Sequence, residues 1–449
     1  MRGIAALYGR LQTVARRIPR AAWLTRDHFL FFALAAVGLL LFMPRALVVM
    51  GYAMERFVLG MPVVKPALLG WPSMPTTLLL FVGASLLTFF LGTTARLAAL
   101  VSLSVVSGFA SGYLDVRSLP VFAVFLAASF ATIRLPISRL AATLILCILA
   151  LGLLLVSVHW FKNAAIATIG TFQMTLIPML WYSAYEHKPP RRPLEFHRFA
   201  AYLYVRFFSG PVVTYGDMFT RVSGPRLAEV RFAGFKALYA AGAASFAAAG
   251  ADLLWRKVQV GELTGLSLLL VSYVGYVGEY CKIVVVFNVV TGVLRLFGLP
   301  IRDNFNYWLL ARTPNEHWQR WNLLFREWVI TFVFFPIMRA KRWLFAAIMA
   351  SLLASGLLHV IPAALIDSPG LFNGMKDMGY WAVNGLAIYL VLKIPVLFPR
   401  LVPALRMQGS VAWSIVGVVM TSSFYGVLFG VRASSNSWTD VARFFERLF

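Results

Sequence analysis

Residues 263–299 read LTGLSLLLVSYVGYVGEYCKIVVVFNVVTGVLRLFGL, an apolar stretch longer than one membrane span requires. About 20 apolar residues suffice for a helix to cross the hydrocarbon core of a bilayer. The stretch carries Glu279 and Lys282 three residues apart, which places both on one face of the expected helix. Ionisable groups inside a span are costly and often functional. We favour an ion pair that fixes helix packing, because no other polar residue converges on it.

The composition of the whole chain fits a membrane protein with many spans. Of its 449 residues, 60% are hydrophobic and only 13% are charged, which lies outside the range of soluble globular domains. We therefore predict an all-α polytopic membrane protein with roughly 11 transmembrane helices. The apolar runs that predict them are residues 28–43, 76–92, 96–112, 119–133, 139–158, 164–184, 232–252, 264–297, 343–361, 380–397 and 411–431.

The net charge of +24 has a topological explanation. A surplus of this size suggests nucleic acid as the partner of a soluble protein, but here Lys and Arg sit in short loops between apolar runs. Such loop charges orient membrane proteins and contact anionic lipid. We therefore expect the lipid bilayer, and no nucleic acid, as a partner. Arginines crowd residues 1–27, which predicts a cytoplasmic N-terminus in the plasma (inner) membrane.

The first part of the chain reads as a scaffold. Residues 1–27 form a basic cytoplasmic segment, and residues 28–185 are transmembrane helices with little chemical content. The first apolar run ends at Pro44 without a small-residue cleavage site, so we expect a retained helix. Cys147 and Cys281 lie within apolar runs and offer no disulfide framework.

The character of the chain changes after residue 186. Residues 205–226, VRFFSGPVVTYGDMFTRVSGPR, are too polar and too often interrupted by Gly and Pro for a plain spanning helix. Broken backbone at membrane depth needs protein or water around it, so we expect a re-entrant or interfacial element there. The Ala-rich residues 232–252 predict a helix that packs closely against a neighbour.

Residues 304–328, NFNYWLLARTPNEHWQRWNLLFREW, gather polar, aromatic and basic side chains in a chain that is otherwise nearly all apolar. Trp318, Trp321, Phe325 and Trp328 recur at helical spacing and predict one helix with an aromatic face, which Asn322 borders. Taken alone, this pattern is also typical of an interfacial belt of tryptophans.

Two histidines are candidates for chemistry. His359 lies near the end of the apolar run SLLASGLLHVIP, which contains no acid. A neutral histidine can accept a proton from a hydroxyl near neutral pH, and a packing role is the alternative. His317, just before the tryptophans, is a second candidate. The sequence has no HExxH or GxSxG motif, no cluster of His, Asp and Glu, and no phosphate-binding Gly-rich loop. We therefore expect no metal site and no serine hydrolase.

Several blocks, in order along residues 187–400, resemble the membrane-bound O-acyltransferase family. The resemblance is strongest to the bacterial branch that includes the alginate O-acetylation and teichoic-acid D-alanylation proteins. Residues 209–218, SGPVVTYGDM, are similar to the family's AGPI stretch, and residues 294–322, LRLFGLPIRDNFNYWLLARTPNEHWQRWN, to its ARLFGF, ENFN and FWRRWH motifs. Residues 354–360, ASGLLHV, stand where the family has GLWHG, and residues 380–385, YWAVNG, resemble its WGLLHG. Ordered agreement of several blocks is more specific than any single block.

The resemblance implies a fold and a site. The fold is a helical bundle with re-entrant or interfacial helices and a central funnel. In it, residues 186–400 form the catalytic core, and residues 401–449 form a last transmembrane helix and an amphipathic tail. His359 matches the family's catalytic histidine, and Asn322 matches its second active-site position. The chain departs from the family where Lys282 and Asn288 replace acids and where Asn384 replaces a later histidine.

The resemblance also implies a reaction. It is the transfer of an acyl group, acetyl or another short chain, from a cytoplasmic acyl-CoA or acyl-carrier thioester to a hydroxyl of an exported glycan or lipid-linked envelope acceptor. No cofactor is bound, and other export or acyl-transfer proteins are candidate partners. The residues expected to bind donor or substrate are Trp318, Trp321, Arg302, Arg312, Arg320 and Arg326, although the arginines also fit a purely topological role. The alternatives are a transporter or flippase and a non-catalytic assembly partner.

Overall fold

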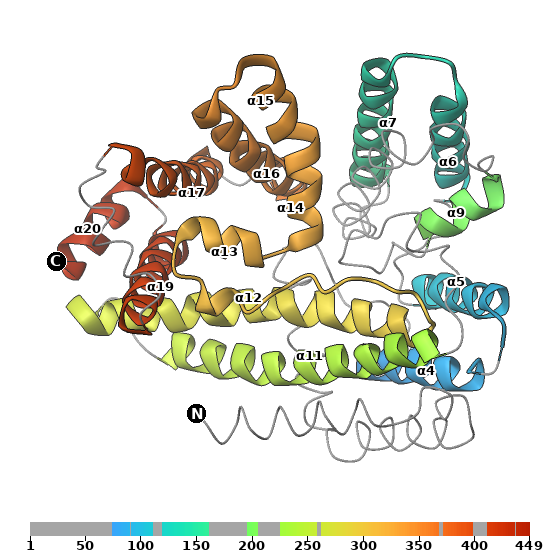
Figure 1. The fold of residues 1–449 in the computed structure, drawn as a ribbon, viewed down its shortest axis with the longest axis horizontal. Helices are drawn as coiled ribbons and strands as arrows, with labels where there is room; N and C mark the ends of the chain where they lie inside the picture. Colours follow the sequence, from blue (N-terminus) through green and yellow to red (C-terminus); the bar gives the residue numbers. More distant parts are fainter. Residues whose placement is uncertain are drawn as a thin grey trace.

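The computed structural model describes residues 74–89, 91–110, 119–160, 195–204, 225–257, 262–367, 371–397, 411–435 and 437–449. Within these ranges the chain forms helices and no strand (Figure 1). The prediction of an all-helical fold is therefore confirmed for this part of the chain.

Most of the predicted apolar runs coincide with helices. These are α4 Met74–Leu87, α5 Thr93–Ala110, α6 Leu119–Arg134, α7 Arg139–Trp160, α11 Pro225–Lys257, α12 Gly265–Leu296, α16 Leu344–Asp367, α17 Leu371–Leu397 and α19 Val411–Ser434. By length and composition, α12, α19 and most of α11 could cross a membrane. The predicted spans at residues 28–43 and 164–184 lie outside the described residues, as does most of the predicted re-entrant segment.

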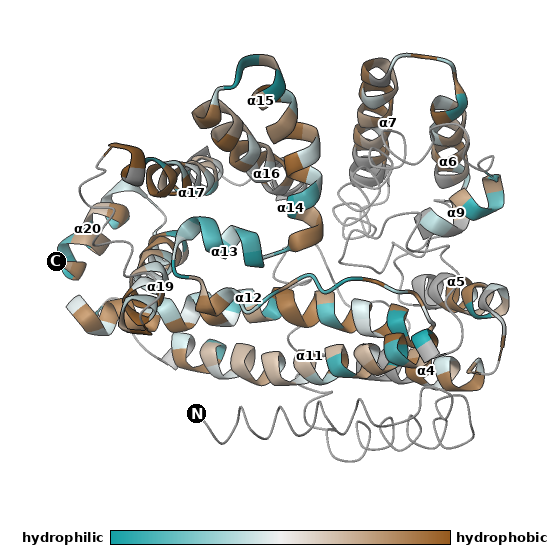
Figure 2. Ribbon diagram, in the orientation of Figure 1, coloured by the Kyte–Doolittle hydropathy of each residue, from teal (hydrophilic) through white to brown (hydrophobic). Residues whose placement is uncertain are grey.

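Shorter elements fill the remaining described positions. They are α9 Phe196–Tyr204, the 3-10 turn η6 Trp308–Leu310, α13 Pro314–Arg320, α14 Leu323–Val329, the π-helix η7 Ile330–Phe334, α15 Phe335–Lys341 and α20 Trp438–Leu448. The elements from η6 to α15 occupy the segment that gathers polar and aromatic residues in the sequence. Figure 2 shows α13 as a hydrophilic helix beside strongly apolar ones.

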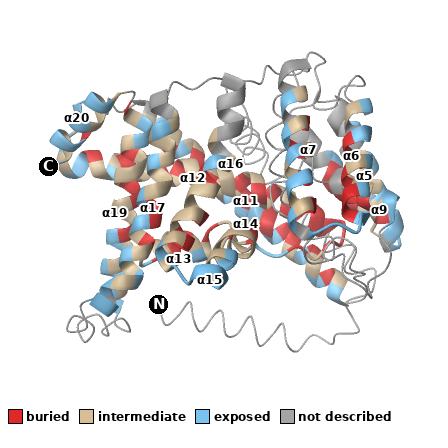
Figure 3. Cartoon of the chain, turned by 90° about the horizontal axis from the view of Figure 1, so that it is seen from above, coloured by how far each residue is buried: buried red, intermediate tan, exposed pale blue. Residues whose placement is uncertain are grey.

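Helices α11 and α12 form a long antiparallel pair along one side of the molecule (Figure 1). Small residues let the two backbones approach: a Cβ on Gly234 would lie 2.8 Å from the carbonyl oxygen of Gly292, and Gly278 faces Ala251. Helices associate this way in lipid, where burying large apolar side chains brings little advantage. The close packing predicted from the Ala-rich segment is confirmed. Figure 3 shows buried residues along this pair and also around α5 and α6.

Helix α12 ends in a turn that reverses the chain. Gly298 adopts a left-handed conformation with φ 88°, and its N–H donates to the carbonyl of Arg295 at 2.9 Å. The N–H of Leu299 donates to the carbonyl of Leu294 at 3.0 Å. These two bonds satisfy the last carbonyls of the helix as in a Schellman motif, and Pro300 prevents its continuation. The loop that follows runs back along α12 toward α13 (Figure 1).

The predicted single helix with an aromatic face is wrong. Helix α13 stops before Trp321, which is extended, and Asn322 then takes a left-handed conformation with φ 46° and ψ 56°. This break sends Trp318 and Trp321 into a cluster with tyrosines of α12 and α19, whereas Phe325 and Trp328 join the larger apolar core. The two halves of the expected face therefore contact different parts of the protein.

Helix α14 widens into the π-helix η7 before α15 begins. The N–H of Phe335 donates to the carbonyl of Ile330, five residues earlier. Pro336 has no N–H to donate and its ring crowds the preceding turn, which favours a wider turn here. The chain then returns through α16, which packs along α17 and against η7.

Candidate active site

The turn between α13 and α14 is held by the loop that precedes η6. The N–H of Asn306 donates to the carbonyl of Arg320 at 2.8 Å, and the N–H of Leu323 donates to the backbone carbonyl of Asn304 at 2.9 Å. The side-chain Nδ2 of Asn304 donates to Oδ1 of Asn322 at 2.9 Å. Asn322, the expected second active-site residue, is therefore fixed by a loop 18 residues earlier in the chain.

Beside this turn, His317 is enclosed by six aromatic rings, a group that we call the His317 cluster. The ring centroids lie between 4.2 and 6.3 Å from that of the imidazole and belong to Tyr276, Tyr280, Trp308, Trp318, Trp321 and Tyr425. Only 1% of His317 is exposed, and its Nε2 has no hydrogen-bond partner among the described residues. Burial lowers the pKa of His317 to about 3, against an opposing contribution from the backbone of Trp308. The imidazole is therefore neutral near pH 7.

We expect the burial of His317 to make the protein sensitive to acid, and His317→Phe to remove that sensitivity. The folded-state pKa lies below the unfolded value of about 6.5, so the unfolded chain binds the extra proton and stability falls as pH drops below that value. At pH 5 the expected loss is about 2 kcal/mol. Melting temperatures of the wild type and His317→Phe in detergent at pH 8 and pH 5 check this. An equal loss in both proteins would contradict it.

Helix α17 connects the His317 cluster to the helix that bears His359. The indole N–H of Trp318 donates to Oδ1 of the buried Asn384 at 3.2 Å, and its ring centroid lies 5.3 Å from that of Trp381. Trp381 packs on Gly356, where a Cβ would lie 2.7 Å from the indole. Gly356 lies three residues before His359, so this contact is one helical turn from the expected base. The sequence comparison identified Asn384 only as a residue that replaces a histidine of the family, and it did not predict the contact with Trp318.

His359 itself lies on α16, but its side chain is outside the described part of the structure. The neighbouring Leu358 packs against the apolar core that includes Trp328 of α14. Pro362 cannot donate to the carbonyl of Leu358, which weakens the helix at this turn. The structure thus brings the helix of His359 beside α14 and α17.

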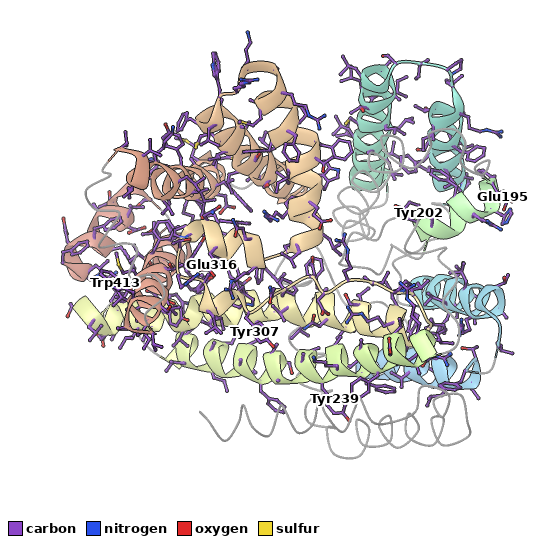
Figure 4. The ribbon with its side chains drawn as sticks, viewed as in Figure 1. Glu195, Tyr202, Tyr239, Tyr307, Glu316 and Trp413 are labelled. Carbon is purple, nitrogen blue, oxygen red and sulfur yellow. The ribbon has the colours of Figure 1, made fainter. Side chains whose placement is uncertain are left out.

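Three of the four arginines expected to bind a donor are engaged by carboxylates. Arg302 donates to both oxygens of Glu327, at 2.9 and 2.7 Å. Glu316, labelled on α13 in Figure 4, accepts from Arg312 at 3.2 Å and from Arg320 at 2.5 Å. Burial acts to raise the pKa of Glu316, but the bonds from Arg312 and Arg320 outweigh this effect and hold the pKa below its usual value.

Arg326 differs from the other three. It lies on α14, one turn after Asn322, and is half buried. Burial lowers its pKa, and the charge of Glu327 opposes this effect. No hydrogen bond or ion pair joins its guanidinium to another described residue. Of the four, Arg326 is therefore the cation best placed to accept an external anion.

A polar group of three joins α11 to α12. The Nζ atom of Lys282 lies 2.8 Å from Oδ1 of Asp252 on α11 and 3.0 Å from Oε2 of Glu279. The side chains of Lys282 and Asp252 are only 12% and 18% exposed. The ion pair predicted from the sequence is confirmed. The expectation that no other polar residue converges on it is wrong, because Asp252 joins it from a second helix, and this contact across the helix interface fits a packing role.

The described site offers hydrogen-bond donors and a free cation. Within the described ranges, no group of three or more His, Cys, Asp or Glu side chains could hold a metal ion. The amide of Asn322 can donate to a carbonyl oxygen, and the guanidinium of Arg326 can pair with a phosphate. These groups suit the polarisation of a carbonyl and the binding of an anionic ligand.

Part of the chain is similar to a known protein. No protein-family model matches the chain. Its sequence is similar to diacylglycerol O-acyltransferase 1-1 of Oryza sativa subsp. japonica, at 29% identity over 91 residues. The match covers 20% of this chain and 15% of the rice protein, so the chain matches only a small part of its relative's length. The rice protein belongs to the membrane-bound O-acyltransferase family. The similarity therefore supports that family resemblance, without distinguishing a bacterial branch.

Proposed function

We propose that this chain is a membrane O-acyltransferase. The observation that carries the proposal is a local similarity to a diacylglycerol O-acyltransferase in a chain that holds an asparagine amide in a fixed turn at Asn322. The turn and the helix that bears His359 share neighbours on α14 and α17. A positioned histidine and a positioned hydrogen-bond donor are the groups that acyl transfer to a hydroxyl needs.

The reaction is a direct transfer in a single attack. His359 accepts the proton of the acceptor hydroxyl while the hydroxyl oxygen attacks the thioester carbonyl. Asn322 donates to the carbonyl oxygen as negative charge develops there. The C–S bond then breaks, the thiolate leaves and takes up a proton, and the acyl group stays on the acceptor oxygen. No side chain of the protein forms a covalent intermediate.

The donor in this proposal is an acyl-CoA or acyl-carrier thioester that enters from the cytoplasm. The first choice of acceptor is a hydroxyl of an exported glycan or another envelope acceptor, with acetyl or another short acyl chain, as in the bacterial branch that the sequence resembles. A lipid hydroxyl is the second choice, because the similar rice protein is a diacylglycerol O-acyltransferase. The proposal also places the protein in the inner membrane with its N-terminus in the cytoplasm.

Labelled donors test the activity and choose between the acceptors. Membranes with and without the protein are incubated with radiolabelled acetyl-CoA or oleoyl-CoA and then separated into polysaccharide and lipid fractions. Label from acetyl-CoA in polysaccharide supports the first acceptor, and label from oleoyl-CoA in neutral lipid supports the second. Equal incorporation with and without the protein, for both donors, would refute the proposal.

A transporter and a non-catalytic assembly partner are the rival functions. The transporter predicts solute uptake into vesicles that survives replacement of His359 and fails when Glu279 or Lys282 is replaced. The described contacts of Lys282, which bridge α11 and α12, favour a packing role for these charges. An assembly partner predicts that envelope acylation requires the chain but tolerates loss of His359.

We expect Arg326→Ala to raise the KM for acyl-CoA by about 10-fold or more, because a hydrogen bond to a charged group contributes about 1.5–3 kcal/mol. The value of kcat should change little, since the phosphates lie far from the reacting carbonyl. Arg302→Ala is the matched control and should leave KM within about twofold, because Glu327 already engages that guanidinium. Initial rates over a range of acyl-CoA concentrations measure both. Equal KM values for Arg326→Ala and the wild type would show that Arg326 does not bind the donor.

A further inference from the structure

Asn304 is a buried residue whose polar atoms are nearly all used. It is 1% exposed and lies in the loop between α12 and η6. Its backbone carbonyl accepts from the N–H of Leu323 at 2.9 Å. Its side-chain Oδ1 accepts from the N–H of Leu324 at 3.1 Å, and its Nδ2 donates to Asn322 at 2.9 Å. One side chain thus holds both the start of α14 and the amide of Asn322.

These contacts decide which way the two amides face. Oxygen and nitrogen of an Asn amide are assigned from their hydrogen-bond partners. Here the partner of one Asn304 atom is the backbone N–H of Leu324, a donor, so that atom must be the oxygen. The other atom is then the nitrogen, and it must face the oxygen of Asn322. The Nδ2 of Asn322 is therefore directed away from Asn304, and no described residue accepts from it.

The backbone at Asn322 is fixed as well. Its φ of 46° and ψ of 56° are left-handed values that Asn tolerates better than most residues. Two backbone bonds bracket this conformation, one from Leu323 to Asn304 and one from Asn306 to Arg320. The turn is therefore fixed on both sides, and the amide direction depends on Asn304.

We propose that Asn304 is a positioning residue that makes Asn322 a hydrogen-bond donor in the site. The inference rests on the proposed function, because the group that receives this bond is the carbonyl oxygen of an acyl thioester. Negative charge develops on that oxygen during attack, so a donor there stabilises the transition state, whereas an amide oxygen would repel it. Asn304 does not touch the substrate. It acts by excluding the reversed orientation of the Asn322 amide.

Asn304→Asp tests the inference because it replaces Nδ2, the atom that donates to Oδ1 of Asn322, with an oxygen. The aspartate keeps an oxygen for the N–H of Leu324, but its second oxygen repels Oδ1 of Asn322. The Asn322 amide then turns its Nδ2 inward and the donor is lost from the site. We expect the kcat of the folded protein with acyl-CoA to fall about 100-fold, with KM within about twofold. The melting temperature near pH 7 should fall as well, because Asn304→Asp buries an ionised carboxylate. Asn306→Asp, at an exposed residue of the same loop, is the matched control and should retain the wild-type kcat.

A pH profile separates positioning from a structural role. Once protonated, the carboxyl introduced by Asn304→Asp can again donate to Oδ1 of Asn322, and burial raises the pKa of a carboxyl above its ordinary value of about 4. The kcat of Asn304→Asp per folded protein, relative to wild type, should therefore rise as pH falls. A constant ratio, or a wild-type kcat for Asn304→Asp, would overturn the inference.

The proposed function and this inference fail in different ways. If the wild type transfers no acyl group from acetyl-CoA or oleoyl-CoA, the function fails. The hydrogen bond between Asn304 and Asn322 can then still be tested by the melting temperatures of variants. Asn322→Asp should melt like the wild type because Asn304 can donate to a carboxylate, and Asn304→Asp/Asn322→Asp should lose more than the sum of the single changes. Additive losses would overturn the pairing itself.

Discussion

Replacement of His359 by alanine is expected to lower the rate of acyl transfer by about 10²–10⁴-fold, the usual contribution of a positioned general base. The acceptor hydroxyl would keep its proton during attack, so the loss should appear in kcat. Alanine is the best helix former, so α16 should persist. Initial rates with labelled acyl-CoA measure the effect, and the amount of folded protein in the membrane is measured in parallel.

His197→Ala is the control for this substitution. His197 lies on α9, with 76% of its side chain exposed, and its Nε2 lies 3.2 Å from Oε2 of Glu195. It should retain the wild-type rate. If His359→Ala also retains that rate, His359 is not the base, and the acyltransferase proposal would need another proton acceptor. The buried His317 is poorly suited to replace His359, because aromatic rings enclose its imidazole and burial lowers its pKa.

The helices of this fold follow from the composition of the chain. Backbone groups in lipid have no water to bond, so a long apolar run must satisfy them internally as a helix. The run at residues 263–299 accordingly forms α12, and its end at Gly298 follows from a glycine followed two positions later by Pro300. The approach of α11 to α12 was predictable because both helices carry small residues at their interface.

The break at Asn322 was not predictable in the same way. Trp318, Trp321, Phe325 and Trp328 have helical spacing, and local periodicity favours an unbroken helix. What opposes it is a set of bonds from a loop at Asn304, distant in sequence and brought close only by the reversal after α12. Hydrogen bonds between residues far apart in sequence produce no periodic pattern in the sequence from which they could be predicted. The tolerance of Asn for left-handed backbone was the available clue.

The ion pairs of the site are of two kinds, those between residues close in sequence and those between residues far apart in sequence. Glu316 and Arg320 lie four residues apart on α13, so their pairing could have been predicted from helical spacing. Arg312 precedes the helix and reaches Glu316 from its N-terminal side. The partner of Arg302 is Glu327, 25 residues away, and only the fold brings them together. The same holds for Asp252, which joins Lys282 from another helix. Sequence spacing therefore predicts ion pairs between residues close in sequence, but it does not predict that Arg326 is the arginine without a carboxylate partner among the described residues.

Replacement of Lys282 by methionine is expected to destabilise the fold by up to about 3 kcal/mol, the lower end of the cost of removing one partner from a buried ion pair, because these side chains are partly exposed. Methionine has a similar length and is apolar, so it should fit between α11 and α12 without a cavity. The change removes the cation that Asp252 and Glu279 share, and it leaves their negative charges close together at the helix interface. Thermal or denaturant unfolding in detergent measures the loss.

Two further variants separate charge from packing in this group. Lys236→Met changes an exposed lysine of α11 and should alter stability by about 0.5 kcal/mol or less. Asp252→Asn/Lys282→Met should recover much of the stability lost in Lys282→Met, because the remaining acid, Glu279, is 41% exposed and can reach solvent. If the double variant is as unstable as the single one, the loss comes from packing rather than from uncompensated charge. A recovered fold with unchanged acyl transfer would assign these charges to the joining of α11 and α12, whereas a recovered fold with no acyl transfer would assign them to the reaction.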